Sequence, residues 1–205
     1  MRTICRSLAS IVAWVALATS VGAQPAPDHA WSRGTTLQGF AGVAVDPATS
    51  GAAVGGALGW ELTPRFGLEG AGTWFNFGDQ YDAFGAGMKL RVRLSGTHKI
   101  DPFLHGGAGV YIADFGANHA EEPASGFYQR RMDAEPDALF GHTFSDPALL
   151  FGGGVNLYLT RQFALRPNVE AMVVMDGGHS QVMTVVALHA VYLFEDRPVT
   201  PSRRR

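Results

Sequence analysis

Four residues within the polar stretch 116–147 of this 205-residue chain have side chains that bind metal ions in proteins. His119, Glu121, Glu122 and His142 offer imidazole nitrogens and carboxylate oxygens, which transition metals and calcium accept as ligands. Their spacing matches no compact ligand motif. A solvated acidic loop explains these residues more simply, so we predict no metal site.

A second group has the residue types of a hydrolase. Asp176, His179 and Ser180 lie close together in the sequence and supply an acid, a base and a nucleophile. Neighbouring residues on a strand point to opposite faces, so His179 and Ser180 are badly placed to hydrogen-bond to each other. The glycine-rich stretches precede no predicted helix, so they are not phosphate-binding loops. We therefore predict no catalytic residue, no cofactor and a non-enzymatic protein.

Residues 88–94 carry a different chemistry, because charged and apolar side chains alternate along them. Lys89, Arg91 and Arg93 lie on one face of a β-strand and the residues between them on the other, since successive side chains alternate in direction. Such a strand needs an apolar environment on one face and polar partners on the other. Either the apolar face packs in a soluble core, or it contacts lipid while the charges lie inside a closed barrel.

The first 23 residues have the pattern of a secretory signal peptide. Arg2 and Arg6 form a positively charged start, and residues 8–18 form an apolar core. Small residues then precede a predicted cleavage site between Ala23 and Gln24. The apolar core is too short to cross the ~30 Å of a bilayer's hydrocarbon as a helix. The mature chain is therefore predicted to be exported.

The composition narrows the class of protein. The predicted leader contains two of the 16 Lys and Arg residues and none of the 18 Asp and Glu residues, so the mature net charge is −4. A slightly acidic exported protein is poorly suited to binding nucleic acid. Cys5 is the only cysteine and lies in the leader, so neither disulfides nor thiolate ligands hold the mature chain together.

The rest of the chain shows alternating apolar and polar residues, interrupted by turn residues, and no apolar run long enough for a transmembrane helix. This pattern is the weak signature of membrane β-barrel strands. We predict an all-β fold, an eight-stranded antiparallel up-and-down transmembrane β-barrel. It covers residues 34–195, between an N-terminal periplasmic segment at 24–33 and a C-terminal tail at 196–205. The predicted strands are 34–46, 50–62, 66–77, 83–95, 102–115, 148–160, 163–175 and 182–195.

Strand parity places seven charged residues inside this barrel, four positive and three negative. Eight strands enclose only enough space for side chains, and a network of opposite charges is the least costly way to bury them. We therefore predict a plugged polar interior, in which inward glycines make room for the long Arg and Lys side chains. The predicted network consists of Glu61, Glu69, Lys89, Arg91, Arg93, Arg166 and Glu170.

Aromatic residues near the strand ends are expected to form girdles at the two membrane interfaces. Phe66 and Trp74 are separated by about 27 Å of strand, or roughly 20 Å of vertical rise at a tilt near 40°. This rise is close to the ~25 Å apolar band of outer-membrane barrels. The predicted girdle residues are Trp60, Phe66, Trp74, Phe163, Tyr192 and Phe194.

The connections between the predicted strands differ in length. Those at 63–65, 96–101 and 160–162 are short, whereas 116–147 is long and acidic. Outer-membrane barrels have short periplasmic turns and longer outer loops. With the N-terminus in the periplasm, all three short turns fall on the periplasmic side, and 116–147 is predicted to be an extracellular loop.

Two segments carry a family resemblance. Residues 58–66 (LGWELTPRF) and 152–160 (GGGVNLYLT) resemble strands of the outer-membrane β-barrel domain family, the small barrels similar to the OmpA transmembrane domain and OmpW. The resemblance covers about residues 34–195 and implies insertion by the barrel assembly machinery, for which Tyr192 and Phe194 resemble the C-terminal signal. It also implies contact with outer-membrane lipid and lipopolysaccharide.

Three functions agree with these observations. The first is a non-enzymatic outer-membrane protein with a structural or surface-interaction role, in which loop 116–147 binds a surface partner. The second is a narrow porin or OmpW-like permeation path. The third is a soluble periplasmic lipocalin-like barrel, with the apolar residues of 88–94 inside and the charged ones outside.

Overall fold

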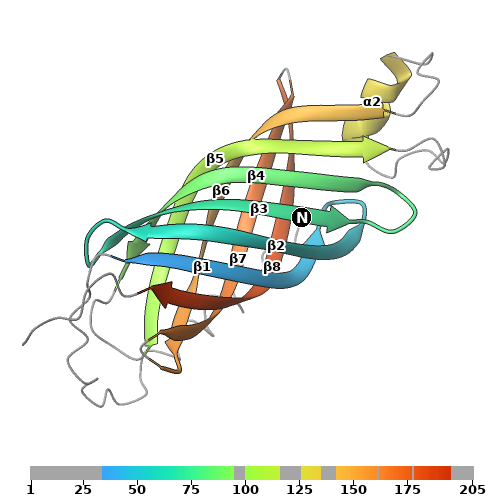
Figure 1. Cartoon of the computed structure of the whole chain (residues 1–205). Coiled ribbons are helices and arrows are strands. Elements are labelled where there is room, and N and C mark those ends of the chain that lie inside the picture. The colour runs from blue at the N-terminus through green and yellow to red at the C-terminus, as the bar shows by residue number, and fades with distance from the viewer. Residues whose placement is uncertain are drawn as a thin grey trace, which may run out of the picture.

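The computed structural model describes residues 34–94, 100–115, 126–134, 142–160, 162–176 and 178–194. These residues form eight strands and one short helix (Figure 1). No helix within these ranges is long and apolar enough to cross a bilayer. The elements are β1 (Thr35–Val45), β2 (Ser50–Glu61), β3 (Phe66–Asn76), β4 (Asp82–Arg93), β5 (Ile100–Phe115), α2 (Gly126–Ala134), β6 (His142–Tyr158), β7 (Phe163–Asp176) and β8 (His179–Phe194).

The strands form one closed antiparallel barrel. Each strand pairs with the next along the chain, and β1 pairs with β8 from Thr35 opposite Phe194 to Val45 opposite Thr184. Closure leaves no unpaired sheet edge, which a strand structure in hydrocarbon requires. The predicted fold class is therefore confirmed, an eight-stranded up-and-down barrel.

The two ends of the barrel differ. One end, called the turn end below, holds the connections β2–β3, β4–β5 and β6–β7. The other, called the loop end, holds the remaining connections and α2, which lies beside the ends of β5 and β6 (Figure 1). At the loop end β1–β2, β3–β4 and β7–β8 are also joined by short segments. The difference between the ends therefore comes from the β5–β6 connection alone.

The predicted loop 116–147 was too long. Strand β6 begins at His142, six residues before the predicted start, and Phe115 pairs with His142. Parity explains the error, because Phe144, Asp146 and Ala148 are buried and alternate with exposed or half-buried neighbours. Because residues 142–147 are polar in composition, the sequence did not indicate that strand β6 extends over them at the loop end.

Two hairpins at the turn end use the same turn. The hydroxyl oxygen of Thr63 accepts hydrogen bonds from the amides of Arg65 and Phe66, at 3.2 and 2.9 Å. Thr160 does the same for Gln162 and Phe163, at 3.2 and 3.0 Å. A threonine that satisfies two amides in this way fixes a tight reversal. Residues 58–69 (LGWELTPRFGLE) and 155–166 (VNLYLTRQFALR) are also alike in sequence, and this likeness corresponds to repeated local structure.

The alternation in β4 has the membrane-type orientation. Lys89, Arg91 and Arg93 are 5%, 3% and 3% exposed, whereas Leu90 and Leu94 are 45% and 59% exposed. The charged face therefore lines the inside, and the apolar face covers the outside. This is the reverse of the soluble lipocalin-like arrangement.

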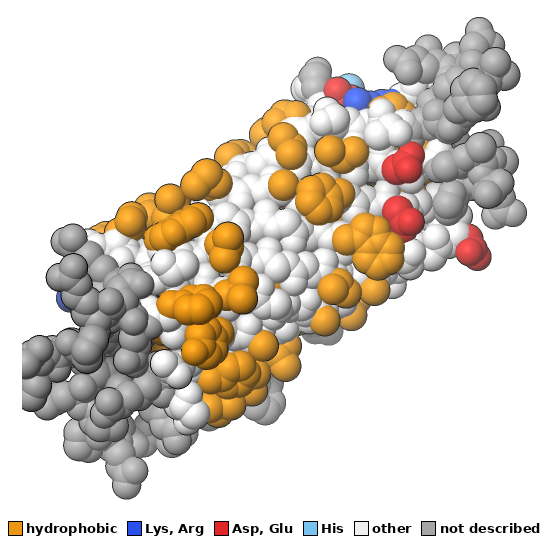
Figure 2. Space-filling view, viewed as in Figure 1, with side chains coloured by type: hydrophobic (Ala, Val, Ile, Leu, Met, Phe, Trp, Pro, Cys, Tyr) orange, Lys and Arg blue, Asp and Glu red, His pale blue; other side chains and the backbone are white. Residues whose placement is uncertain are grey.

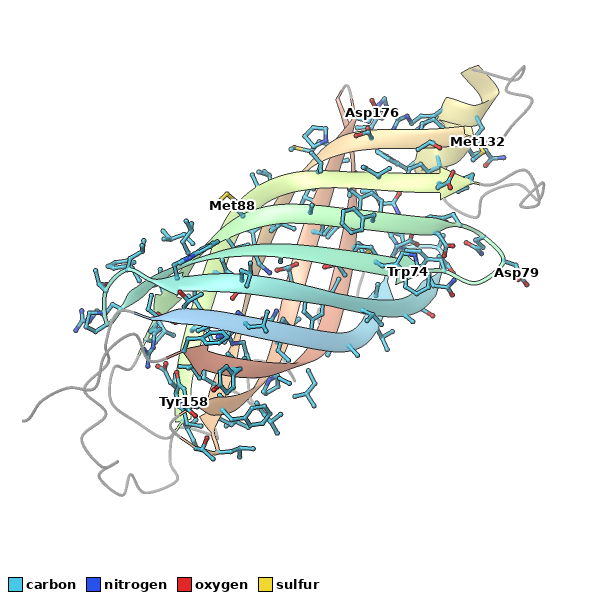
Figure 3. The ribbon with its side chains drawn as sticks, viewed as in Figure 1. Trp74, Asp79, Met88, Met132, Tyr158 and Asp176 are labelled. Carbon is cyan, nitrogen blue, oxygen red and sulfur yellow. The ribbon has the colours of Figure 1, made fainter. Side chains whose placement is uncertain are left out.

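The outer surface of the barrel is mostly apolar. Figure 2 shows hydrophobic side chains spread over the outside of the wall, with acidic residues gathered toward the loop end. Aromatic residues lie near both ends of this apolar zone, and Figure 3 shows Trp74 toward the loop end. A soluble barrel would expose far less large apolar surface.

Candidate functional site

Glu69 lies at the centre of a buried polar network in the turn-end half of the lumen. Its Oε2 accepts hydrogen bonds from Gln38 Nε2 at 2.6 Å, Arg166 Nη1 at 2.9 Å and Arg91 Nη1 at 3.3 Å. Lys89 Nζ lies 3.6 Å from its other oxygen. One carboxylate therefore faces three cations, each contributed by strand β4 or β7.

A second carboxylate extends the network across the lumen. Glu170 Oε2 accepts a hydrogen bond from Lys89 Nζ at 2.8 Å and lies 2.9 Å from His105 Nε2. At the other side Arg91 pairs with Glu61. The structure thus places all seven predicted network residues inside the barrel and joins six of them through direct contacts.

The seventh, Arg93, pairs with an acid that the sequence analysis missed. Asp101 is fully buried and accepts a hydrogen bond from Arg93, and Asn156 Nδ2 lies 3.4 Å from the same carboxylate. Asp101 shares the inward parity of His105 but precedes the predicted start of its strand. With Asp101 the described residues of the turn-end half supply four cations and four anions, whereas the predicted set had one anion fewer than cations.

These side chains fill the turn-end half of the lumen. Phe103 packs beneath two guanidinium groups, with Arg166 Cζ 5.1 Å and Arg91 Cζ 6.0 Å from its ring centroid. Among the described residues, the gap bounded by Glu69, Arg166 and their neighbours leaves no space for a water molecule. Buried ions of opposite sign, held by hydrogen bonds, fit such a closed space because each compensates the others' desolvation.

The loop-end half of the lumen is filled by aromatic rings instead. Phe77 stacks on Tyr81 at a centroid distance of 4.5 Å, and Tyr81 stacks on Phe115 at 4.7 Å. Phe75 lies 5.8 Å from Tyr111 below them. This cluster was not predicted, although each of its strand residues has the inward parity of the charged residues in the other half. Its aromatic and larger aliphatic members are Phe75, Phe77, Tyr81, Tyr111, Phe115, Phe127, Tyr128, Phe144, Leu150, Met172, Val174, Met183 and Val185.

Helix α2 closes the loop end of this cluster. Tyr128 is 1% exposed and its ring lies 5.0 Å from Phe115. Arg131 Nη1 donates to Asp146 Oδ2 at 2.5 Å, and its Nε lies 3.3 Å from Asp176 Oδ2. The helix therefore attaches to the barrel through two buried rings, Phe127 and Tyr128, and one cation, Arg131. The polar composition of this segment predicts a solvated loop and gives no sign of its inward face.

Burial sets the ionisation of two tyrosines at this end. The pKa of Tyr128 is raised well above its usual value, first because the ring is desolvated and then because Tyr111, Asp146 and Asp46 lie nearby. Burial likewise raises the pKa of Tyr81, whose hydroxyl donates to Asp46 Oδ2 at 3.0 Å. Both phenols remain neutral hydrogen-bond donors over the whole physiological pH range.

Comparison with solved structures finds the same architecture in proteins of very different sequence. The N-terminal β-barrel domain of OprF from Pseudomonas aeruginosa matches with a TM-score of 0.52 and 12% identity, over 78% of this chain and 98% of that domain. Neisserial surface protein A matches with a TM-score of 0.60 and 9% identity, over 80% of this chain and 98% of that protein. Both are small eight-stranded outer-membrane β-barrels.

The chain has the fold of a small outer-membrane β-barrel. No protein-family model matches it, and no curated protein sequence does. At these identities the likeness concerns the fold alone. The small-barrel architecture predicted from residues 58–66 and 152–160 therefore agrees with the solved neighbours.

Most of the residues considered for a metal site are not described by the structure. His119, Glu121 and Glu122 lie outside the described residues, and His142 opens strand β6. The described residues contain no group of three His, Cys, Asp or Glu side chains arranged to hold a metal.

The suggested hydrolase group lies at the tip of β7 and β8. Asp176 and His179 are register partners there, and His179 and Ser180 are both exposed. Asp176 contacts Arg131 of α2. Its observed partner is thus a structural cation.

The predicted girdle residues lie on the outside of the small barrel. Trp74 is the one near the loop end, where it is the register partner of Phe84, an exposed ring that the prediction omitted. Contact of these rings with a membrane interface stays a prediction. The exposed fractions of the other large girdle residues are 42% for Trp60, 43% for Phe66, 41% for Tyr192 and 46% for Phe194, and Phe163 is half-buried.

The inward glycines do less for the charged groups than predicted. A Cβ at Gly85 would lie 3.2 Å from the ring of Phe75, so this glycine makes room for an aromatic side chain. A Cβ at Gly67 would lie 3.0 Å from Arg91 Nη2, so this glycine does make room for a charged side chain. Small residues in the wall thus accommodate whichever large side chain lies opposite.

Proposed function

We propose that this protein is a non-conducting outer-membrane anchor that presents its loop end to the outside of the cell. The observation that carries the proposal is the doubly filled lumen, with four ion-paired cations in one half and packed aromatic rings in the other. A solute could pass through the barrel only if both the ion-paired side chains and the aromatic rings moved aside. The proposal therefore favours an anchoring and surface-interaction role over permeation.

The orientation follows from the long β5–β6 connection. Outer-membrane barrels keep short connections in the periplasm and place longer ones outside. Helix α2 and the raised ends of β5 and β6 would then face the exterior, and the predicted leader at 1–23 agrees with export. Chain insertion by the barrel assembly machinery and contact with lipopolysaccharide belong to the same proposal.

Bilayer conductance tests the sealed lumen. The purified protein is reconstituted into planar bilayers, beside a conducting porin from a parallel preparation as the positive control. We expect no steady unitary current, because ion-paired side chains fill one half of the lumen and packed aromatic rings fill the other. Heat-modifiable gel mobility of the same sample verifies that the protein is folded. A reproducible steady current would contradict the proposal and favour the narrow permeation path.

A pair of cysteine variants tests the membrane assignment. The predicted mature chain lacks cysteine, so Leu90→Cys labels the outside of β4 and Asp79→Cys labels the exposed β3–β4 connection, beyond the apolar zone. Each cysteine carries a bimane fluorophore in vesicles that contain brominated lipid. We expect strong quenching at position 90 and weak quenching at position 79. Equal quenching, or recovery of the protein in the soluble fraction after a carbonate wash, would overturn the membrane assignment.

A further inference from the structure

We propose that the loop end of the barrel contains a binding site for a small cation that bears an aromatic ring, and that helix α2 occupies this site as an internal ligand. The site, called the loop-end cup, is formed by Tyr81, Phe115 and Phe144 with the carboxylates of Asp46 and Asp146. The inference rests on the proposed function only in taking this end as the one open to external ligands.

The first half of the internal ligand is an aromatic ring. The ring centroid of Tyr128 lies 5.0 Å from that of Phe115, 5.6 Å from that of Tyr81 and 5.8 Å from that of Phe144. Ring pairs at these distances contribute beyond simple area burial. Tyr128 is therefore held on three sides by rings that belong to the barrel itself.

The second half is a cation one helical turn away. Residues three apart lie on the same face of a helix, so Arg131 follows Tyr128 into the barrel. Its Cζ lies 4.2 Å above the ring centroid of Phe144, and Nη1 donates to Asp146 at 2.5 Å. The cup thus holds a guanidinium between an aromatic face and a carboxylate, which is a cation-binding arrangement.

The barrel forms the cup without help from α2. Strands β5 and β6 pair continuously from Ile100 opposite Leu157 to Phe115 opposite His142. Asp46 is fixed by its own turn, where its Oδ1 accepts from the amide of Ala48 at 2.7 Å. The backbone of this wall and the carboxylate of Asp46 are therefore held by contacts that do not involve the helix.

Both carboxylates of the cup are buried. Asp46 is 6% exposed and accepts from Gln181 Nε2 at 2.7 Å, and Asp146 is 4% exposed. An empty cup would present negative charge at the base of an aromatic wall, and such a site favours cations over neutral rings of the same shape. Figure 3 shows Met132 of α2 and Asp176 together at this end, beside the helix that a ligand would displace.

Binding of tyramine tests the cup, because tyramine joins a phenol ring to an ammonium group. The vacated variant Tyr128→Ala/Arg131→Ala is placed in nanodiscs and titrated calorimetrically with tyramine and with 4-ethylphenol, which lacks the ammonium. Empty nanodiscs correct for partitioning into lipid. Arg130→Ala serves as the matched control, since Arg130 is exposed on the same helix. We expect the vacated variant to bind tyramine at least tenfold more tightly than 4-ethylphenol, and tenfold more tightly than the control does.

Adding Asp146→Asn to the vacated variant should remove the preference for tyramine. Equal affinity for the two ligands, or no binding by a vacated variant that is folded by heat-modifiable mobility, overturns the proposal. If that variant does not fold, hydrogen exchange of residues 126–134 in the unmodified protein decides. Tyramine should accelerate exchange there several-fold and 4-ethylphenol should not, and unchanged protection overturns the proposal. These measurements involve neither conductance nor orientation, so they fail separately from the proposed function.

Discussion

The two halves of the lumen are enclosed by the same eight strands but filled by opposite chemistry. In the turn-end half, Glu69 and Glu170 join the cations of β4 and β7 into a charged network. In the loop-end half, rings such as Phe75 and Tyr128 pack with almost no exposed surface. The same strand geometry therefore accepts either filling, provided that the lumen is occupied and the buried charges are paired.

The difference lies in how each filling responds to a change. A buried ion pair stabilises only while both partners are present, because removing one leaves an uncompensated charge in a closed space. Aromatic packing is the sum of many small contacts, so a substituted apolar side chain of similar size restores most of them. Substitutions that conserve volume should therefore lower the free energy of unfolding much more in the charged half than in the aromatic half.

The largest effect is expected for Glu69→Gln, which conserves volume but removes the carboxylate that faces Arg166, Arg91 and Lys89. We expect the free energy of unfolding to fall by about 3–5 kcal/mol, because the three cations keep their desolvation cost and lose their shared anion. Urea unfolding in lipid vesicles, followed by tryptophan fluorescence and gel mobility, measures the change. The double variant Glu69→Gln/Arg166→Gln should recover part of the loss. A cost below about 1 kcal/mol for the single variant would contradict the network's role.

A smaller effect is expected for Phe75→Leu in the other half. Phe75 is fully buried, 5.8 Å from Tyr111 and 6.3 Å from Phe77 between ring centroids. Leucine keeps the site apolar and most of its volume, so the expected cost is about 1.5 kcal/mol or less. The same unfolding assay applies. A loss equal to that of Glu69→Gln would remove the contrast between charged and aromatic filling.

Much of the charged half could be predicted from strand parity alone. A residue such as Arg91, between two apolar neighbours, has only one face of the sheet that can satisfy its charge, so the alternation fixes its direction. The number of strands and the closed barrel followed from the same alternation. Asp101 was missed because it lies in the predicted connection 96–101, whereas β5 begins at Ile100.

The aromatic half could not be predicted in the same way. An inward ring and a lipid-facing ring are both apolar. Neighbouring residues such as Phe75 and Trp74 therefore show no alternation between polar and apolar side chains, and the sequence does not indicate which of them points inward. Helix α2 was missed for a related reason, because its polar composition resembles a loop and only Phe127 and Tyr128 mark its inward face. The position of α2 depends on contacts with Asp146 and Asp176, which lie elsewhere in the chain.

Alkaline pH should weaken the loop-end half through Tyr128. Burial raises the pKa of Tyr128, whereas the unfolded chain loses that proton near pH 10. The stability contributed by the neutral phenol is therefore complete below about pH 10 and is lost as the pH rises further. Tyr128→Phe has no proton to lose at this position. Above about pH 10 the slope of its unfolding free energy against pH should therefore be less steep than that of the unmodified protein, and the two slopes should differ by about 1.4 kcal/mol per pH unit. Parallel profiles for the two proteins between about pH 8 and about pH 11.5 would contradict this.

Exposed charges on the outer rim of the barrel are expected to have the smallest effect on stability. Asp82 and Asp114 are register partners on β4 and β5, where Asn76 Nδ2 donates to Asp82 at 2.8 Å and Thr143 Oγ1 donates to Asp114 at 3.0 Å. Asp114 is exposed, unlike the carboxylates of the lumen. Like charges directly opposite each other on neighbouring strands destabilise a sheet by a few tenths of a kcal/mol.

The substitution Asp114→Asn should therefore stabilise the barrel, in contrast to Glu69→Gln, although both remove one negative charge. We expect a gain of about 0.2–1 kcal/mol at low ionic strength, because the amide oxygen can still accept from Thr143 while the repulsion from Asp82 disappears. The gain should vanish near 1 M salt, where the screening length is about 3 Å. Asp79→Asn is the matched control, since Asp79 lies exposed in the adjacent β3–β4 connection. If Asp114→Asn instead destabilises the barrel at every salt concentration, the rim carboxylates are engaged as tightly as those inside, and burial no longer explains the difference between them.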